Sequence, residues 1–130
     1  MKILLDHHMK RPGVLLWGVL ENEGWLTLLN IPMLSFADVD LPIDSSDRNV
    51  WQFVQEHRLI LLTANRNNDD EDSLQQTLWD ENQPTSLPVV TIGIIDRVEE
   101  HSYRKQCAEK LVDIVMNIEN YLGVGRIYIP

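Results

Sequence analysis

Leu59-Ile60-Leu61-Leu62-Thr63 is the stretch of sequence that decides the fold. Consecutive apolar residues are typical of a parallel strand that is covered on both faces, because neither face of such a strand meets water. Ile3-Leu4-Leu5 and residues 89–95 have the same character, and apolar residues between these runs recur at helical spacing. Strands that alternate with helices predict an α/β fold. We expect three α/β/α layers around a mainly parallel sheet of about five strands.

The remaining elements can be placed from apolar periodicity and from turn residues. A helix of about three turns should follow Pro12-Gly13 and end near Gly24, and a long helix should run over residues 102–122. Two further helices should begin after Ser45 or Ser46 and after Ser73. Residues 25–29 are short enough to form a strand, residues 32–46 should form a loop, and Ile127-Tyr128-Ile129 should be a short strand near an edge of the sheet.

Composition limits the class of protein. With 130 residues, of which 44% are hydrophobic, residues 1–130 are most simply one domain with a sizeable core. The single Cys107 excludes an internal disulfide and fits a reducing, intracellular setting. No run approaches the roughly 18 apolar residues of a membrane span, and Asp6 interrupts the first apolar run too early for a signal peptide. We therefore expect a cytoplasmic protein that does not enter a membrane.

The formal net charge of −9 argues against a general nucleic-acid binder, which would normally carry a basic surface. It does not exclude a metal-dependent nuclease, because carboxylates that bind divalent cations count as negative charge until the metal arrives.

Three polar segments, which we call stations, lie at positions that a parallel sheet would bring to the same edge. Asp6 follows the first strand, Ser46-Asp47 opens a helix, and Thr63-Ala64-Asn65-Arg66-Asn67 follows the next strand. The carboxyl ends of parallel strands meet at one edge of the sheet, where ligands of open α/β folds bind. The stations should therefore form one site.

These motifs, in this order, resemble those of the PIN-like domains, specifically the short single-domain bacterial PIN-like proteins. The resemblance covers roughly the first half of the chain. It implies a PIN-type fold and a ribonuclease that depends on Mg²⁺ or Mn²⁺, with the toxin half of a toxin–antitoxin pair as one form of such a protein. In that chemistry the metal activates a water and neutralises charge on the scissile phosphate.

The resemblance also assigns candidate residues. Asp6 matches the first family carboxylate, Asp47 matches the helix-start carboxylate, and Asn65 and Asn67 match two positions where the family usually carries Asp. Asn offers a neutral oxygen that can ligate a hard cation without adding charge. The implied metal ligands are Asp6, Asp47 and Asn65, together with Asp69 if the acidic run that also contains Asp70 and Asp72 shifts into the site. His7-His8 replaces the family's Glu-Asn and could ligate a transition metal or contact phosphate.

RNA is the expected partner, and Lys10, Arg48 and Arg66 are the basic residues placed to contact its phosphates. A small antitoxin-like protein and a second copy of the chain are further expected partners. Spare apolar residues such as Trp25, Leu26 and Leu28 would suit a homodimer. The four tryptophans, Trp17, Trp25, Trp51 and Trp79, are expected in the core or at an interface.

Two alternatives stay open. The Asn residues and the acidic surface favour a catalytically degenerate PIN-fold module that only binds a partner. A receiver-like phosphoryl-transfer domain would use Asp6 as phospho-acceptor or metal ligand. Such a domain generally needs an Asp after a later strand, whereas the strand that ends at Thr63 is followed by Ala64 and Asn65.

Overall fold

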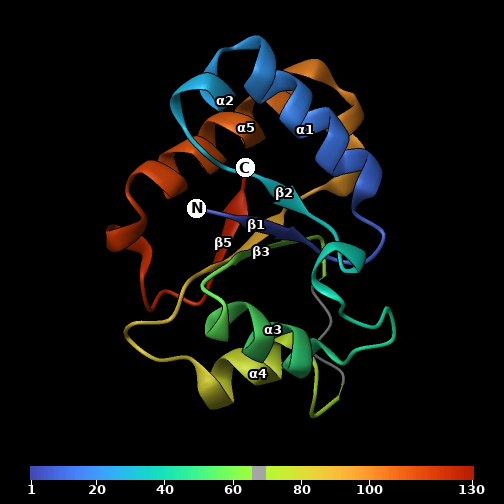
Figure 1. Ribbon diagram of the computed structural model, residues 1–130, viewed down its shortest axis with the longest axis vertical. Helices are drawn as coiled ribbons and strands as arrows, with labels where there is room; N and C mark the ends of the chain where they lie inside the picture. Colours follow the sequence, from blue (N-terminus) through green and yellow to red (C-terminus); the bar gives the residue numbers. More distant parts are fainter. Residues whose placement is uncertain (66–69) are drawn as a thin grey trace.

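A five-stranded, fully parallel sheet forms the middle of the molecule (Figure 1). The computed structural model describes residues 1–65 and 70–130. The strands lie in the order β2-β1-β3-β4-β5, with bounds β1 (Ile3–Leu5), β2 (Met33–Leu34), β3 (Ile60–Thr63), β4 (Val89–Ile92) and β5 (Arg126–Ile129). The sequence-based prediction of a parallel sheet with a short last strand at an edge is confirmed.

Helices cover both faces of this sheet, which confirms the three-layer prediction (Figure 1). One face carries α1 (Lys10–Asn22), α2 (Trp25–Leu28) and α5 (His101–Met116), and the other carries α3 (Asp47–Glu56) and α4 (Leu74–Glu81). Short 3-10 turns complete the described part, at η1 (Ala37–Val39), η2 (Ile95–Glu99) and η3 (Ile118–Tyr121). No helix in the described ranges combines the length and the apolarity of a membrane span.

The three central strands are mostly apolar and fully buried because each contributes to two cores. Ile3, Ile60 and Leu62 face the layer of α1 and α5, whereas Leu4 and Leu61 face the layer of α3 and α4. All five side chains are almost fully buried. Each buried aliphatic side chain contributes roughly 1.5–3 kcal/mol of transfer free energy, so the sheet is a rigid base for the loops at its edges.

The segment between α1 and α3 departs from prediction. The strand expected over residues 25–29 is wrong: this stretch is the short helix α2, because Gly24 adopts a left-handed conformation (φ 82°) and turns the chain at once after α1. The sheet's second strand is instead β2, which lies inside the loop expected over residues 32–46. Two residues are too few for a periodic pattern to reveal.

Some element ends also differ from expectation. The run expected as a strand over residues 89–95 stops at Ile92, and the long helix stops at Met116 before η3. Trp17 and Trp51 are buried in the core, one of the two places expected for the tryptophans, whereas Trp79 on α4 is 69% exposed, so that only the expected interface role stays open for it. Cys107 is a buried free thiol, and burial raises its pKa to about 12.

The order of the strands creates a switch point at β1. From β1 the chain moves outward to β2, returns past β1 to β3, and continues to β4 and β5. The connections on the two sides of β1 therefore diverge at the carboxyl ends of β1 and β3, and ligands of open α/β sheets bind in such a crevice. Gly13 helps to keep α1 close behind this point, since a Cβ there would lie 2.6 Å from Leu5 Cδ1.

Candidate functional site

Asp6 stands at the switch point, directly after β1, and is held by the neighbouring strand β3 and by the backbone of His7. Its backbone N–H continues the ladder by donating to the Leu62 carbonyl (2.9 Å). Its Oδ1 accepts from the backbone N–H of His7 (2.8 Å), and its Oδ2 accepts from the Thr63 hydroxyl (2.6 Å). The carboxylate is therefore fixed in one orientation before any ligand arrives.

Thr63, the last residue of β3, connects the first station with the third. Its side chain is fully buried. Its Oγ1 donates to Asp6 and accepts from the backbone N–H of Asn65 (2.9 Å). One hydroxyl thus sets the position of the first carboxylate and the path of the chain that leaves β3.

Asp47 is the first residue of α3, where the sequence placed it. Ser46 is the N-cap, and its hydroxyl accepts from the Asn49 backbone N–H (3.1 Å). A carboxylate in the first turn is stabilised by the helix dipole. Asp47 Oδ2 accepts two hydrogen bonds, from the Asn65 side-chain amide (2.8 Å) and from the Leu74 backbone N–H (3.1 Å).

Arg126 at the start of β5 belongs to the same network, although it was not among the residues predicted for the site. Its Nη1 donates to the Asn65 carbonyl (2.6 Å) and to the Thr91 hydroxyl (2.7 Å). The guanidinium therefore holds the backbone of Asn65 while the Asn65 side chain holds Asp47. A charged residue at the head of an apolar strand was the available signal for Arg126, and the polar end of the clearest strand was the signal for Thr63.

A cleft of about 460 Å³ opens between these elements, and Asp6, Asp47, Thr63 and Asn65 all line it. The pKa of Asp6 is raised, first by burial and further by the negative charge of Asp47, while hydrogen bonds from Thr63 and His7 pull it down. Three of the predicted site residues, Asp6, Asp47 and Asn65, are thus brought together at one edge of the sheet.

The donor set of this cleft suits a hard divalent cation. Mg²⁺ is commonly held by one or two carboxylates and keeps several of its waters. A cation between Asp6 and Asp47 would offset both causes that raise the pKa of Asp6. Within residues 1–65 and 70–130, no three side chains of His, Cys, Asp or Glu form a group that could hold a metal.

Three of the predicted residues, Asn67, Asp69 and Arg66, lie outside the described residues. His7 and His8 line the cleft, and their rings lie against each other with centroids 3.7 Å apart. Lys10 is exposed at the first residue of α1. It lines an adjoining hollow rather than the cleft itself.

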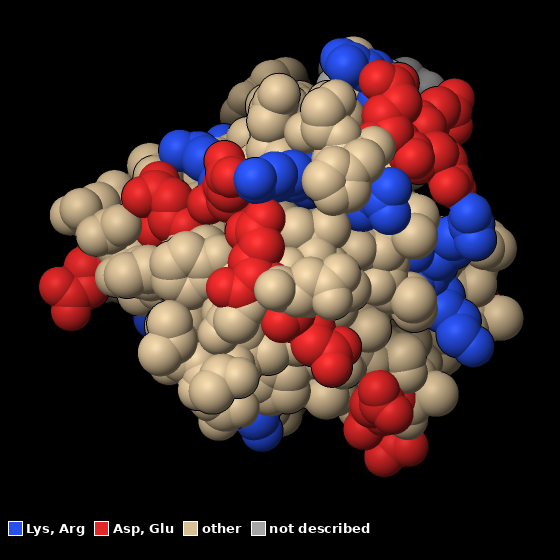
Figure 2. Space-filling view, turned by 90° about the horizontal axis from the view of Figure 1, so that it is seen from above, with Lys and Arg blue, Asp and Glu red and all other residues tan. Residues whose placement is uncertain are grey.

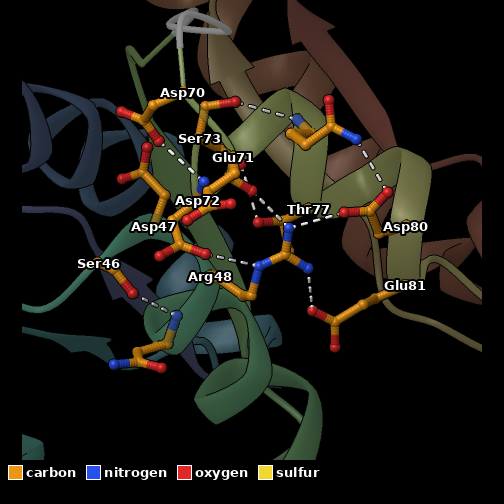
Figure 3. Close-up of polar contacts among 12 residues, drawn as sticks. Ser46, Asp47, Arg48, Asp70, Glu71, Asp72, Ser73, Thr77, Asp80 and Glu81 are labelled. Atoms are coloured by element: carbon orange, nitrogen blue, oxygen red, sulfur yellow. Dashed lines mark hydrogen bonds and ion pairs between the residues drawn. The ribbon is translucent and has the colours of Figure 1, made fainter.

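Arg48, predicted to contact phosphate, is surrounded by acidic side chains (Figure 3). Its guanidinium pairs with Asp72 (2.9 Å), Asp80 (2.8 Å) and Glu81, and it also donates to the Glu71 carbonyl (2.6 Å). A phosphate would have to compete with three carboxylates for this cation. Asp72, one of the acids that could have moved into the cleft, is engaged here instead.

The charges on the face covered by α1, α2 and α5 are mixed. Figure 2 shows basic and acidic side chains interspersed there among uncharged ones. Such a surface offers a long phosphate backbone little continuous attraction.

Comparisons of this chain with protein-family models, curated proteins and solved structures found no match.

Proposed function

We propose that this protein is a PIN-like ribonuclease that hydrolyses a phosphodiester bond with Mg²⁺ or Mn²⁺. The observation that carries the proposal is the convergence of Asp6 and Asp47 on one cleft at the switch point of a parallel sheet. Both carboxylates are held by neutral donors: the Thr63 hydroxyl, the Asn65 amide and backbone N–H groups. Their negative charge therefore stays available to a cation.

Each residue of the network has a defined part in this chemistry. Asp6 and Asp47 would hold the cation, which when bound supplies an activated water and neutralises charge on the scissile phosphate. Thr63 fixes the orientation of Asp6, and the Asn65 amide fixes that of Asp47. Arg126 holds the Asn65 carbonyl and so keeps the amide in place. A cytoplasmic location and pairing with a small antitoxin-like protein are parts of the same proposal.

A catalytically silent binding module is the second candidate. The neutral Asn65, which stands where the family usually carries a carboxylate, favours it. So does the use of the Asn65 amide N–H on Asp47. In that case the same cleft would bind a partner, such as a small protein or a second copy of the chain, without cleaving RNA.

Calorimetric titration with Mn²⁺ and Mg²⁺ tests the proposal. We expect the wild type to bind and the double variant Asp6→Asn/Asp47→Asn to lose binding, because both carboxylates are replaced by neutral amides. The matched control is Asp80→Asn/Glu81→Gln, which removes the same charge beside Arg48 and should leave binding unchanged. Equal binding by the wild type and the cleft variant would refute the metal site.

An RNA-cleavage assay then separates the two candidates. Cleavage by the wild type that requires the metal and is lost in the cleft variant supports the ribonuclease. Metal binding without cleavage of single-stranded or structured RNA supports the binding module.

A further inference from the structure

A groove of about 250 Å³ lies between α1 and the start of α5, the two longest helices of the described chain, which pack together on one face of the sheet (Figure 1). It is separate from the cleft, because no described residue lines both. Its lining is apolar along α1, at Val14, Leu15 and Val19, and becomes polar toward the end of α1. A ligand bound in this groove therefore does not contact Asp6 or Asp47.

Gly18 leaves open space in the apolar part of the groove. A Cβ built on it would meet no heavy atom within 4 Å, so no contact among the described residues requires a glycine here. Glycine inside a helix is less favourable than alanine, and Gly18 lies well inside α1. Val14 and Leu15 precede it by about one turn and line the same groove. This part of the groove suits a small aliphatic group.

Glu23 and Arg104 line the polar part of the groove and carry opposite charges. Lys105, the residue after Arg104, has its Nζ 3.9 Å from Glu23 Oε1, so the Glu23 carboxylate reaches the turn of α5 that carries Arg104. Among the described residues, however, no ion pair joins Glu23 directly to Arg104. The two charges therefore share one groove without neutralising each other directly.

The Arg104 guanidinium retains unused hydrogen-bond donors. Its Nη2 donates to the Glu99 carbonyl (3.2 Å). Its Nε is shielded from solvent and has no hydrogen-bond partner in the part of the chain that the structure describes. A buried donor without an acceptor is costly, and the guanidinium fork matches the two oxygens of a carboxylate. Arg104 is therefore placed to bind a carboxylate that enters the groove.

We propose that this groove binds a free α-amino acid with a small aliphatic side chain. The carboxylate of the ligand pairs with Arg104, its ammonium group pairs with Glu23, and its side chain lies over Gly18. A molecule with both charges is favoured over a simple anion or a simple cation, because either of those would leave one charge of the groove unmatched. The inference does not depend on the proposed ribonuclease, since the groove and the cleft share no described residue.

Titration with L-leucine, followed in ¹H–¹⁵N NMR spectra of the full chain, tests the inference. The signals to follow are the backbone amides of Val19 and Asn22, which line the groove. We expect millimolar L-leucine to shift these signals in a saturable manner. 4-Methylpentanoate lacks the ammonium group and 3-methylbutylamine lacks the carboxylate. Each should bind more weakly than L-leucine by about tenfold or more, because each leaves one charged contact unmade.

Gly18→Leu separates binding from folding. The new side chain fills the space that the ligand would occupy, so binding of L-leucine should be lost. Because the added Cβ meets no neighbouring atom and leucine favours a helix more than glycine does, Tm should stay the same or rise. Unchanged binding of L-leucine by this variant would overturn the inference.

Arg104→Gln tests the polar part of the groove and should weaken binding of L-leucine about tenfold or more. The matched control is Arg97→Gln, which removes a charge that is paired with Glu100 outside the groove and should bind like the wild type. The inference is also wrong if the wild type shows no saturable shift, if it binds L-leucine and 4-methylpentanoate equally, or if Arg104→Gln binds like the control.

Discussion

Two acidic regions among the described residues, the cleft and a cluster around Arg48, are balanced in opposite ways. In the cleft, Asp6 and Asp47 are partnered by neutral hydroxyl, amide and backbone donors. In the second region, which we call the arginine cluster (Arg48, Asp72, Asp80 and Glu81), the chain supplies its own cation. The two regions lie on either side of the first turn of α3, since Asp47 and Arg48 are adjacent residues.

The difference appears in how easily the carboxyl groups ionise. Burial and the nearby charge of Asp47 raise the pKa of Asp6. Hydrogen bonds from Arg48 and then Gln76 lower the pKa of Asp80. An acidic residue therefore does not mark a metal site by its presence alone. A cluster that contains an arginine is already partly neutralised, whereas in a cluster held only by neutral donors the whole charge is left for a cation to offset.

The largest effect is expected from removing the Arg126 guanidinium, which supports the cleft through Asn65. Arg126→Met leaves the Asn65 carbonyl without its guanidinium donor, so the amide that orients Asp47 loses its support. Loss of such an outer contact typically weakens metal binding by about 10- to 100-fold. Calorimetry should show this loss for Mn²⁺ and a partial recovery in Arg126→Lys. Arg11→Met, which breaks an exposed pair with Glu99, should bind like the wild type, and an equal affinity of Arg126→Met would show that Asn65 holds its position unaided.

The next largest effect is expected from removing Arg48, which would make the arginine cluster, like the cleft, a group of carboxylates without a cationic partner. Arg48→Met leaves Asp72, Asp80 and Glu81 without their shared cation, so their mutual repulsion should lower Tm. Millimolar Ca²⁺ should then recover part of that Tm in the variant and change the wild type less, because the three carboxylates have no cationic partner in the variant, whereas in the wild type they share the Arg48 guanidinium. Arg97→Met removes a single exposed pair with Glu100 and should change Tm little. An equal change of Tm with Ca²⁺ in the variant and the wild type would contradict this contrast between the two acidic regions.

A smaller effect follows from the pH dependence of Asp6. Its pKa is raised above the ordinary value of 3.8, so the folded protein holds this proton more tightly than the unfolded chain does. Between 3.8 and the raised value, stability therefore falls as pH rises. The Tm of the wild type relative to Asp6→Asn should decline as pH rises from about 3 to about 8 without metal. Added Mn²⁺ should reverse the trend, since it binds the ionised form; a Tm difference that is independent of pH would contradict the assignment.

The smallest effect concerns the helix start that both regions share. Ser46→Ala removes the hydroxyl that accepts from the Asn49 N–H, and loss of such a cap costs about 1 kcal/mol. Urea unfolding should show this loss in the free energy of unfolding. Ser102→Ala, at an exposed position within α5, is the control and should be close to neutral. A neutral Ser46→Ala would mean that Asp47 and the packing of α3 keep the helix start in place without the cap.

The frame of the fold could be predicted because its signals are local. The continuous apolar run of β3 and the capping serines each act on neighbouring residues. Ser73 caps α4 as predicted, and Ser46 is the one of the two predicted serines, Ser45 or Ser46, that caps α3. The swap between the expected strand at residues 25–29 and the observed β2 was not predictable in the same way. An apolar stretch of that length suits either element, and the turn at Gly24 decides between them.

The candidate site was predictable only in part. Asp6, Asp47 and Asn65 follow from the rule that strand ends and helix starts meet at one edge of a parallel sheet. Thr63 and Arg126 act through contacts that span 57 and 61 residues of the chain, and no local pattern shows such pairs. The contacts of Arg48 with Asp80 and Glu81 of α4 span 32 and 33 residues and are likewise invisible to a local pattern. Its basic charge alone therefore suggested a phosphate contact that the acidic surroundings disfavour.

The place of β1 between β2 and β3 has a consequence for the order in which the molecule assembles. β1 pairs with β3 through residues that are 57 apart in the chain, as in the Ile3–Ile60 and Leu5–Leu62 pairs. Closing such a long loop costs entropy before any pairing can repay it, so the central pair of strands should form late in folding. Asp6 meets Thr63 and approaches Asp47 only when that pair closes. The repulsion between the two carboxylates therefore arises only after most of the core has formed. A divalent cation that binds them should slow unfolding more than it speeds folding.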